Sequence, residues 1–174
     1  MKKIVGGITS PQGFVAAGVK AGIKKSGKED VALIVSQAPA ASAAVFTQNR
    51  MAAAPVLISR ETAAKGKLRA IVINSGCANA CTGEQGMIDA RLMLTTTAGL
   101  LGITEDEVLV SSTGVIGVLL PMDKVLTGIE AAAASLSVDG HGQALQGIMT
   151  TDTFPKVCAY ELTLGGVTVK IAGI

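Results

Sequence analysis

Short apolar runs rich in β-branched residues alternate along this chain with patterns typical of amphipathic helices. Residues 30–35 (Asp-Val-Ala-Leu-Ile-Val) and 70–73 (Ala-Ile-Val-Ile) are two such runs, and each predicts a buried strand. Residues 87–101 instead carry apolar side chains at helical spacing. Strands that alternate with helices predict an α/β or α+β fold, which we expect to form essentially one domain over residues 1–174.

Capping signals predict where the helices begin. Thr82–Gln85 and Thr104–Glu107 have the form of a capping box, a hydroxyl residue followed three positions later by Gln or Glu. The first box predicts a helix that ends at Gly102, and the second predicts one short turn. Pro121 predicts the first turn of a helix that runs to about residue 136, and a short helix is expected near 141–149. The first helix is expected to bury one apolar face, formed by Met87, Ala90, Leu94, Ala98 and Leu101.

Three more strands are predicted in the second half of the chain, at residues 108–112, 157–164 and 167–171. The last two flank Gly165-Gly166, a two-residue connection typical of a tight hairpin. Alternation predicts that the apolar residues of each hairpin strand share one face, Cys158, Tyr160, Leu162 and Leu164 on the first and Val167, Val169 and Ile171 on the second.

The apolar part of the composition consists mostly of small residues. The chain has 26 Ala and 21 Gly but only three Phe, one Tyr and no Trp. A core of this kind gains stability from the close approach of backbones rather than from large rings.

The same composition excludes several classes of protein. A net charge of +2 and so few aromatic residues provide neither a basic stripe nor a stacking surface for nucleic acid. No apolar run approaches the roughly 18 residues that a membrane span requires, so we expect no membrane association. Three cysteines without an export signal predict reduced thiols and a cytoplasmic location.

Three motifs suggest chemistry that their context argues against. Gly22–Glu29 approximates a phosphate-binding loop, but Glu29 replaces the Mg²⁺-binding hydroxyl, so we expect a basic turn between two strands. Cys77 and Cys81 lack a second close pair of ligands, so we expect buried packing cysteines and no metal. His141 lies between two glycines, so we expect an exposed turn, and an acyl-transfer reaction here would need another base.

Three polar segments are better candidates for a site. Residues 74–83 leave a predicted strand and enter a helix, where α/β folds commonly bind ligands. Thr113 and Gly114 place a hydroxyl beside a glycine N–H, and two such donors can form an oxyanion hole. Residues 150–156 concentrate hydroxyls with one carboxylate and one amine, and Asp152 and Lys156 could bind the ammonium and carboxylate of an amino acid. Each segment taken alone is also explained as a turn or a helix cap.

The order of these segments resembles that of a known family. The motifs are Asn74-Ser-Gly-Cys-Ala-Asn-Ala-Cys-Thr-Gly-Glu-Gln-Gly86, Ser112-Thr-Gly-Val-Ile-Gly117 with Leu120-Pro-Met-Asp123, and Met149-Thr-Thr-Asp-Thr-Phe-Pro-Lys156. Pro11-Gln-Gly-Phe14, Ala16-Ala-Gly-Val19 and Val45-Phe-Thr-Gln-Asn49 also fit. Together they resemble the ornithine acetyltransferase / glutamate N-acetyltransferase family of arginine biosynthesis, over nearly the whole chain. Cys77 departs from the pattern, because the family more often has Asn there.

The resemblance implies a fold and an active site that two chains share. The family has a layered αββα core of the N-terminal-nucleophile type, made from a precursor that cleaves itself before a threonine. This sequence resembles the α chain up to a point just before the cleavage site. The β chain would complete the fold and supply the nucleophilic threonine, in what we expect to be an α2β2 heterotetramer.

The resemblance also implies a reaction and residues that take part in it. The acetyl group of N-acetylornithine would pass to the threonine and then to glutamate, with no metal or cofactor; whether acetyl-CoA is a second acetyl donor stays open. Thr113 and Gly114 match the family's oxyanion hole, and the Thr150-Thr151 region matches its α-chain substrate site. Asp152 and Lys156 are candidate substrate-binding residues because of their charges and not because of the resemblance. The alternatives are a non-catalytic structural or small-molecule-binding subunit and a related self-processing amidohydrolase.

Overall fold

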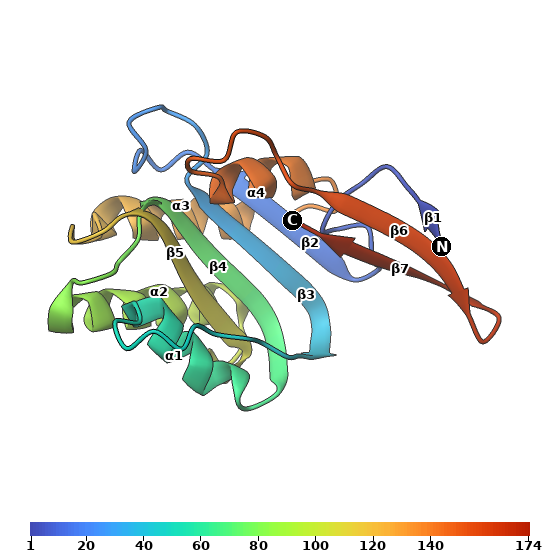
Figure 1. The fold of residues 1–174 in the computed structure, drawn as a ribbon, viewed down its shortest axis with the longest axis horizontal. Coiled ribbons are helices and arrows are strands. Elements are labelled where there is room, and N and C mark those ends of the chain that lie inside the picture. Colours follow the sequence, from blue (N-terminus) through green and yellow to red (C-terminus); the bar gives the residue numbers. More distant parts are fainter.

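Two sheets and four α-helices make up the computed structural model, which describes residues 1–174 (Figure 1). The larger sheet has the order β2-β3-β4-β5, from β2 (Phe14–Val19), β3 (Val31–Ala41), β4 (Lys67–Cys77) and β5 (Val108–Val115). The smaller sheet has the order β1-β6-β7, from β1 (Lys2–Lys3), β6 (Cys158–Leu164) and β7 (Val167–Gly173). The helices are α1 (Ala54–Ala63), α2 (Gly83–Leu101), α3 (Met122–Ala134) and α4 (His141–Ile148), with a 3₁₀ turn at Glu105–Glu107.

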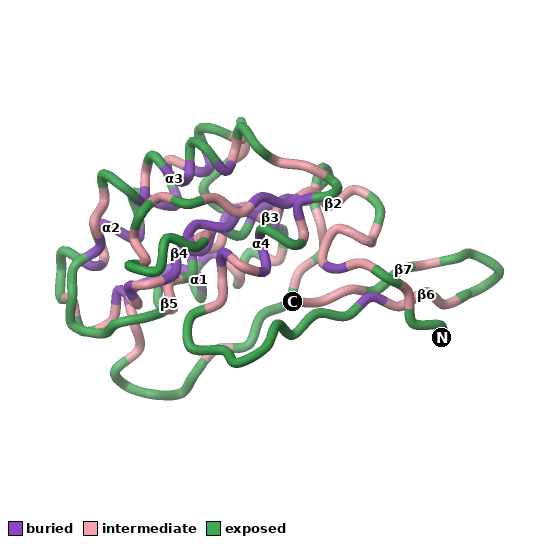
Figure 2. Tube along the Cα trace, turned by 90° about the horizontal axis from the view of Figure 1, so that it is seen from above, coloured by how far each residue is buried: buried purple, intermediate pink, exposed green.

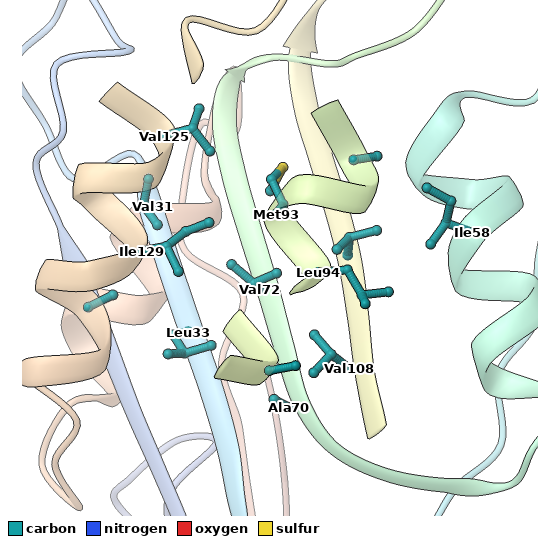
Figure 3. Packing of buried hydrophobic residues seen from close by; sticks show 14 of the residues in the cluster. Val31, Leu33, Ile58, Ala70, Val72, Met93, Leu94, Val108, Val125 and Ile129 are labelled. Carbon is teal, nitrogen blue, oxygen red and sulfur yellow. The ribbon is translucent and has the colours of Figure 1, made fainter. Parts of the chain in front are cut away.

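The main core lies between the larger sheet and the helices α1, α2 and α3. Alternate residues of β3 reach opposite faces, so that Val31 and Leu33 enter this core while Ala32 packs on the other face with Ala144 of α4. The helices contribute Met93 and Ile129, among others, which meet the strand residues in Figure 3. The larger sheet therefore has helices on both faces.

Helix α1 covers the free edge of the larger sheet at β5. The hydroxyl of Ser59 donates to the Val110 carbonyl at 2.7 Å and accepts from the Val110 N–H at 2.9 Å. Both unpaired backbone groups of this edge residue are thereby satisfied, and the edge is closed to pairing with another strand.

Helix α4 packs so closely on the other face that some positions have no room for a side chain. A Cβ at Gly18 of β2 would overlap the carbonyl of Gln143, and one at Gly140 would overlap the carbonyl of Ala16. The expectation that this small-residue composition allows close backbone approach is confirmed here.

The β6–β7 hairpin extends away from the larger sheet, and its strands are exposed or half-buried except at Ala159 (Figure 2). Its register pairs Tyr160 with Ile171 and Leu162 with Val169, which confirms the predicted shared faces and the Gly165-Gly166 turn. Ile171 is 56% exposed, so an apolar face remains uncovered in this chain.

Most predicted elements are present, with differences at their ends. Strands β3, β4 and β5 are longer than predicted, because their ends consist of small or polar residues that carry no apolar pattern. Strands β1 and β2 and helix α1 were not predicted. The sequence marks α1 only weakly. Pro55 lies in its first turn, but the N-cap residue Ala53 supplies no side-chain hydrogen bond.

Three local predictions need correction. Thr82 does not cap α2 through its side chain; its hydroxyl donates to Asn79 Oδ1 at 2.7 Å, whereas the Thr104–Glu107 box is present. Cys77 is buried as expected, but Cys81 and Cys158 are exposed. His141 begins α4 and packs against Gly7 instead of lying in an exposed turn.

No helix is both long and apolar enough to cross a membrane.

The fit of α4 on β2 can be tested with a pair of glycines. Gly18→Ala should lower the free energy of unfolding by about 1–3 kcal/mol, because the new methyl group must displace the α4 backbone. Gly142→Ala on α4, where nothing lies within 4 Å of the added Cβ, should leave stability unchanged or raise it. Urea unfolding of both variants checks this, and equal midpoints would contradict the close packing.

Candidate active site

Three separate segments surround one cavity of about 730 Å³. The first is the β2–β3 connection, at residues 23–26. The second is the pair of strand ends at Gly76 of β4 and residues 113–115 of β5, and the third is Thr150-Thr151 after α4. The two predicted pairs, Thr113 with Gly114 and Thr150 with Thr151, are thus brought together although they are far apart in the sequence.

The register of two parallel strands fixes the position of Thr113 and Gly114. Ser75 pairs with Thr113, and Gly76 pairs with Gly114. Gly76 has a φ of 110° and Gly114 a φ of 133°, and a Cβ at Gly114 would overlap the Gly76 backbone. Only glycine fits this conformation and this separation, so the two strand backbones meet directly at the cavity.

The polar side chains of residues 74–83 hold the cavity edge together and do not point into it. Asn74 is fully buried; its Nδ2 donates to the Cys77 carbonyl at 2.8 Å, and its Oδ1 accepts from the Ser112 hydroxyl at 2.5 Å. Asn79, also fully buried, donates to the Gly86 carbonyl at 2.8 Å. Of residues 74–83, only Gly76 lines the cavity, so only Gly76 is placed to contact a ligand directly.

Backbone pairing joins the loop before α2 to the residues after β5. Ala78 donates to the Val115 carbonyl, and Gly117 donates to the Ala80 carbonyl, each at 2.8 Å. Cys77, where the family pattern more often has Asn, is buried in the main core and its thiol donates to the Val118 carbonyl at 3.1 Å. Its place in the structure is that of a packing residue.

The basic wall of the cavity comes from a segment that the sequence did not mark as part of the site. Residues 20–30 form a turn between β2 and β3, as expected, and Lys24, Lys25 and Ser26 line the cavity. Asp30 is fully buried, and its carboxylate accepts the N–H groups of Ala21, Ile23 and Lys24 at 2.6, 2.6 and 2.9 Å. The sequence signal for this arrangement was the place of Asp30 directly before an apolar strand. A carboxylate that is buried there must accept hydrogen bonds.

Asp152 and Lys156 lie outside the cavity and bind each other. The Lys156 ammonium donates to Asp152 Oδ1 at 2.6 Å and lies 5.3 Å from the centre of the Phe154 ring. Both side chains are exposed. The hydrogen bond from Lys156, with a second from the Thr150 N–H, lowers the pKa of the Asp152 carboxyl.

A second large cavity lies away from the predicted site residues. A cavity of about 720 Å³ lies between residues 9–14 and residues 168–170 of the hairpin, and none of the predicted site residues lines it. No group of three or more His, Cys, Asp or Glu side chains is placed to hold a metal ion.

Comparison with known proteins decides the family. The ArgJ family matches residues 15–174. This chain belongs to the ArgJ family. The curated ArgJ relatives are named arginine biosynthesis bifunctional proteins; that of Symbiobacterium thermophilum is 54% identical over the whole chain, and that of Caldanaerobacter subterraneus is 55% identical over 99% of it. The chain spans 44% and 43% of these two relatives, which is less than half of their length.

Two crystal structures share the ArgJ fold seen here. The ArgJ protein of Bacillus halodurans matches 98% of this chain and 90% of its own chain, with a TM-score of 0.92 and 41% identity. The ornithine acetyltransferase of Mycobacterium tuberculosis, complexed with ornithine, matches 96% and 89% respectively, with a TM-score of 0.88 and 40% identity. The predicted fold class and the predicted family are both confirmed.

The Asp152–Lys156 pair can be tested by titration. Lys156→Met should raise the pKa of the Asp152 carboxyl toward its usual value, because the main hydrogen bond that stabilises the carboxylate is lost. Lys170→Met, an exposed lysine on β7, serves as the control and should leave that pKa unchanged. Carboxyl carbon shifts followed by NMR report the titration, and an unshifted Asp152 in Lys156→Met would contradict the pairing.

Proposed function

We propose that this chain is the α subunit of an acetyltransferase that moves the acetyl group from N-acetylornithine to glutamate. Membership of the ArgJ family and the likeness to an ornithine acetyltransferase crystallised with ornithine support this reaction. The observation that carries the proposal is the cavity in which Thr113 and Gly114 face the same space as Thr150 and Thr151.

The second half of the enzyme is proposed to be a separate β chain cut from the same precursor. The curated relatives are more than twice as long as this chain, whereas the chains in the two crystal structures are covered to 90% and 89% by it. A long precursor and a matching chain of this size fit cleavage into two pieces. The β chain would complete the αββα core, and the cytoplasmic enzyme would assemble as an α2β2 heterotetramer.

The proposed reaction has two half-reactions that share one covalent intermediate. The hydroxyl of the β-chain threonine attacks the acetyl carbonyl of N-acetylornithine, and the threonine's own α-amine takes the hydroxyl proton. The C–N bond then breaks, the proton goes to the leaving nitrogen, and ornithine departs from an acetyl-threonine ester. Glutamate's amine attacks the ester, the C–O bond breaks, and the proton returns to the threonine hydroxyl. No histidine is required as a base.

Negative charge develops on the acetyl oxygen in both half-reactions, and we assign Thr113 and Gly114 to stabilise it. The Thr113 hydroxyl and the Gly114 N–H would donate to this oxygen. Their strand register is fixed before substrate arrives, so little reorganisation is needed when the charge forms. Donors of this kind contribute about 3–4 kcal/mol to the transition state.

The opposite side of the cavity is proposed to bind the amino-acid part of the substrate. Thr150 and Thr151 supply hydroxyls there, and Lys25 adds a positive charge to the wall. Asp152 and Lys156 would join the substrate only if their mutual ion pair opened, and they are proposed as secondary contacts.

The reaction itself is tested by an acetyl-exchange assay on the protein expressed from the full coding sequence. Purified protein should form N-acetylglutamate and ornithine from N-acetylornithine and glutamate without acetyl-CoA, and a co-purifying chain should begin with threonine. Release of acetate without transfer to glutamate would favour the self-processing amidohydrolase. Neither transfer nor hydrolysis would favour a structural or small-molecule-binding subunit. A further assay with acetyl-CoA and glutamate decides whether acetyl-CoA is a second donor.

The oxyanion assignment is tested by Thr113→Ala in the same two-chain protein. Loss of one donor should lower kcat by about 10²–10³-fold, since the transition state loses a charge-stabilising hydrogen bond. Ser111→Ala, which removes an exposed hydroxyl from the same strand outside the cavity, is the control and should retain near-normal turnover. A normal rate in Thr113→Ala would remove Thr113 from this role.

A further inference from the structure

The three walls of the cavity are not equally well held. Gly76, Thr113 and Gly114 are fixed by strand pairing, and the β2–β3 turn is fixed by the buried Asp30 carboxylate. Thr150 and Thr151, by contrast, lie outside any helix or strand and are exposed. Their position must therefore depend on how the end of α4 is anchored.

Lys24 provides one anchor between the turn and the end of α4. Its ammonium donates to the Gln146 carbonyl at 3.1 Å and to the Glu29 carbonyl at 2.6 Å. Gln146 lies in the last turn of α4, where carbonyl groups have no partner within the helix. A cation at this end also interacts favourably with the helix dipole.

Ser75 provides a second anchor next to the first. Its hydroxyl donates to the Gly147 carbonyl, and its N–H donates to the Asp30 carbonyl oxygen at 2.8 Å. Ser75 is fully buried and directly precedes Gly76 of the cavity. Two successive carbonyls of α4 are thus tied to the turn and to β4, just before the chain reaches Thr150.

The environment of Lys24 strengthens its hydrogen bonds. The residue is partly buried, and this desolvation lowers its pKa, although the nearby Asp30 and Glu29 carboxylates act in the opposite direction. The Lys24 backbone N–H is also held by Asp30 at 2.9 Å, so the side chain extends from a fixed point. Hydrogen bonds made by a charged, partly dehydrated group are stronger than those between neutral groups in water.

We propose that Lys24 is a positioning residue that holds Thr150 and Thr151 against the cavity through the last turn of α4. Its ammonium acts on the backbone and not on the substrate. The consequence for substrate binding rests on the acetyl-transfer function proposed above; the structural anchoring does not. Because Thr113 and Gly114 are fixed by the sheet instead, Lys24 should influence substrate binding more than the chemical step.

Steady-state kinetics of the two-chain enzyme test whether Lys24 affects substrate binding more than the chemical step. Lys24→Met removes both donated hydrogen bonds and should raise KM for N-acetylornithine about tenfold or more, with kcat within twofold of the original. Lys24→Arg keeps the charge and the donors and should restore most of the affinity. Lys28 is an exposed lysine of the same turn, and its side chain makes no hydrogen bond. Lys28→Met should therefore leave both KM and kcat unchanged.

A fall in kcat equal to that in kcat/KM, or an unchanged KM in Lys24→Met, would overturn the proposal. If Lys24→Met does not fold, Lys24→Arg decides: a near-original KM supports positioning by charge and donors, and a tenfold rise in KM contradicts it.

Hydrogen exchange of the same two-chain protein separates this proposal from the proposed function. Backbone amides of residues 145–148, which lie in the last turn of α4, should exchange at least several-fold faster in Lys24→Met than in the unaltered protein or in Lys28→Met. If the unaltered protein transfers no acetyl group, the proposed function fails while the exchange rates still decide whether Lys24 anchors this segment. Unchanged exchange at residues 145–148 would overturn the anchoring itself.

Discussion

Direct contact between backbones, without side chains between them, sets the positions of α4 and of the strand ends at the cavity. At Gly18 and Gly140 it lets α4 lie against the larger sheet, and at Gly76 and Gly114 it brings the ends of β4 and β5 together at the cavity. The first contact determines where the chain emerges toward Thr150, and the second determines where Thr113 is presented. Both sides of the candidate site therefore depend on positions, Gly18 and Gly140 on one and Gly114 on the other, where a Cβ would overlap a neighbouring backbone.

Close packing alone does not align the walls, because the β2–β3 turn has no regular structure of its own. A buried carboxylate is costly to remove from water, and Asp30 meets that cost with three short hydrogen bonds from the turn. The same residue accepts the Ser75 N–H through its carbonyl oxygen. One buried residue thus links the basic wall to the strand that carries Gly76, and Lys24 and Ser75 extend the link to α4.

The sequence predicted elements where the apolar pattern was strong and residue roles where the order of motifs was specific. The buried runs of β3, β4 and β5, the apolar face of α2 and the hairpin register could all be predicted, because each follows from a local period. Thr113, Gly114, Thr150 and Thr151 came from motif order, and the structure places them at one cavity. Whether they act in catalysis stays a prediction.

The missed features share a physical reason, which is that they depend on contacts between distant segments. Helix α1 lacks a side-chain cap, and its Ser59 hydroxyl bonds to the backbone of Val110 on the edge strand β5. Thr82 has the sequence of a capping box, but its hydroxyl bonds to the buried Asn79. Lys24 was assigned to a plain basic turn, since nothing local indicates that its ammonium reaches a helix more than a hundred residues away.

We propose that the cavity between the β2–β3 turn, the ends of β4 and β5 and the Thr150 segment is the acetyl-transfer site. The most direct measurement is a crystal structure of the two-chain protein with N-acetylornithine bound. We expect the acetyl oxygen within about 3 Å of both the Thr113 hydroxyl oxygen and the Gly114 nitrogen, with the amino-acid end toward Thr150 and Thr151. Ligand bound in the other large cavity, beside residues 9–14, or an acetyl group turned away from Thr113 would contradict it.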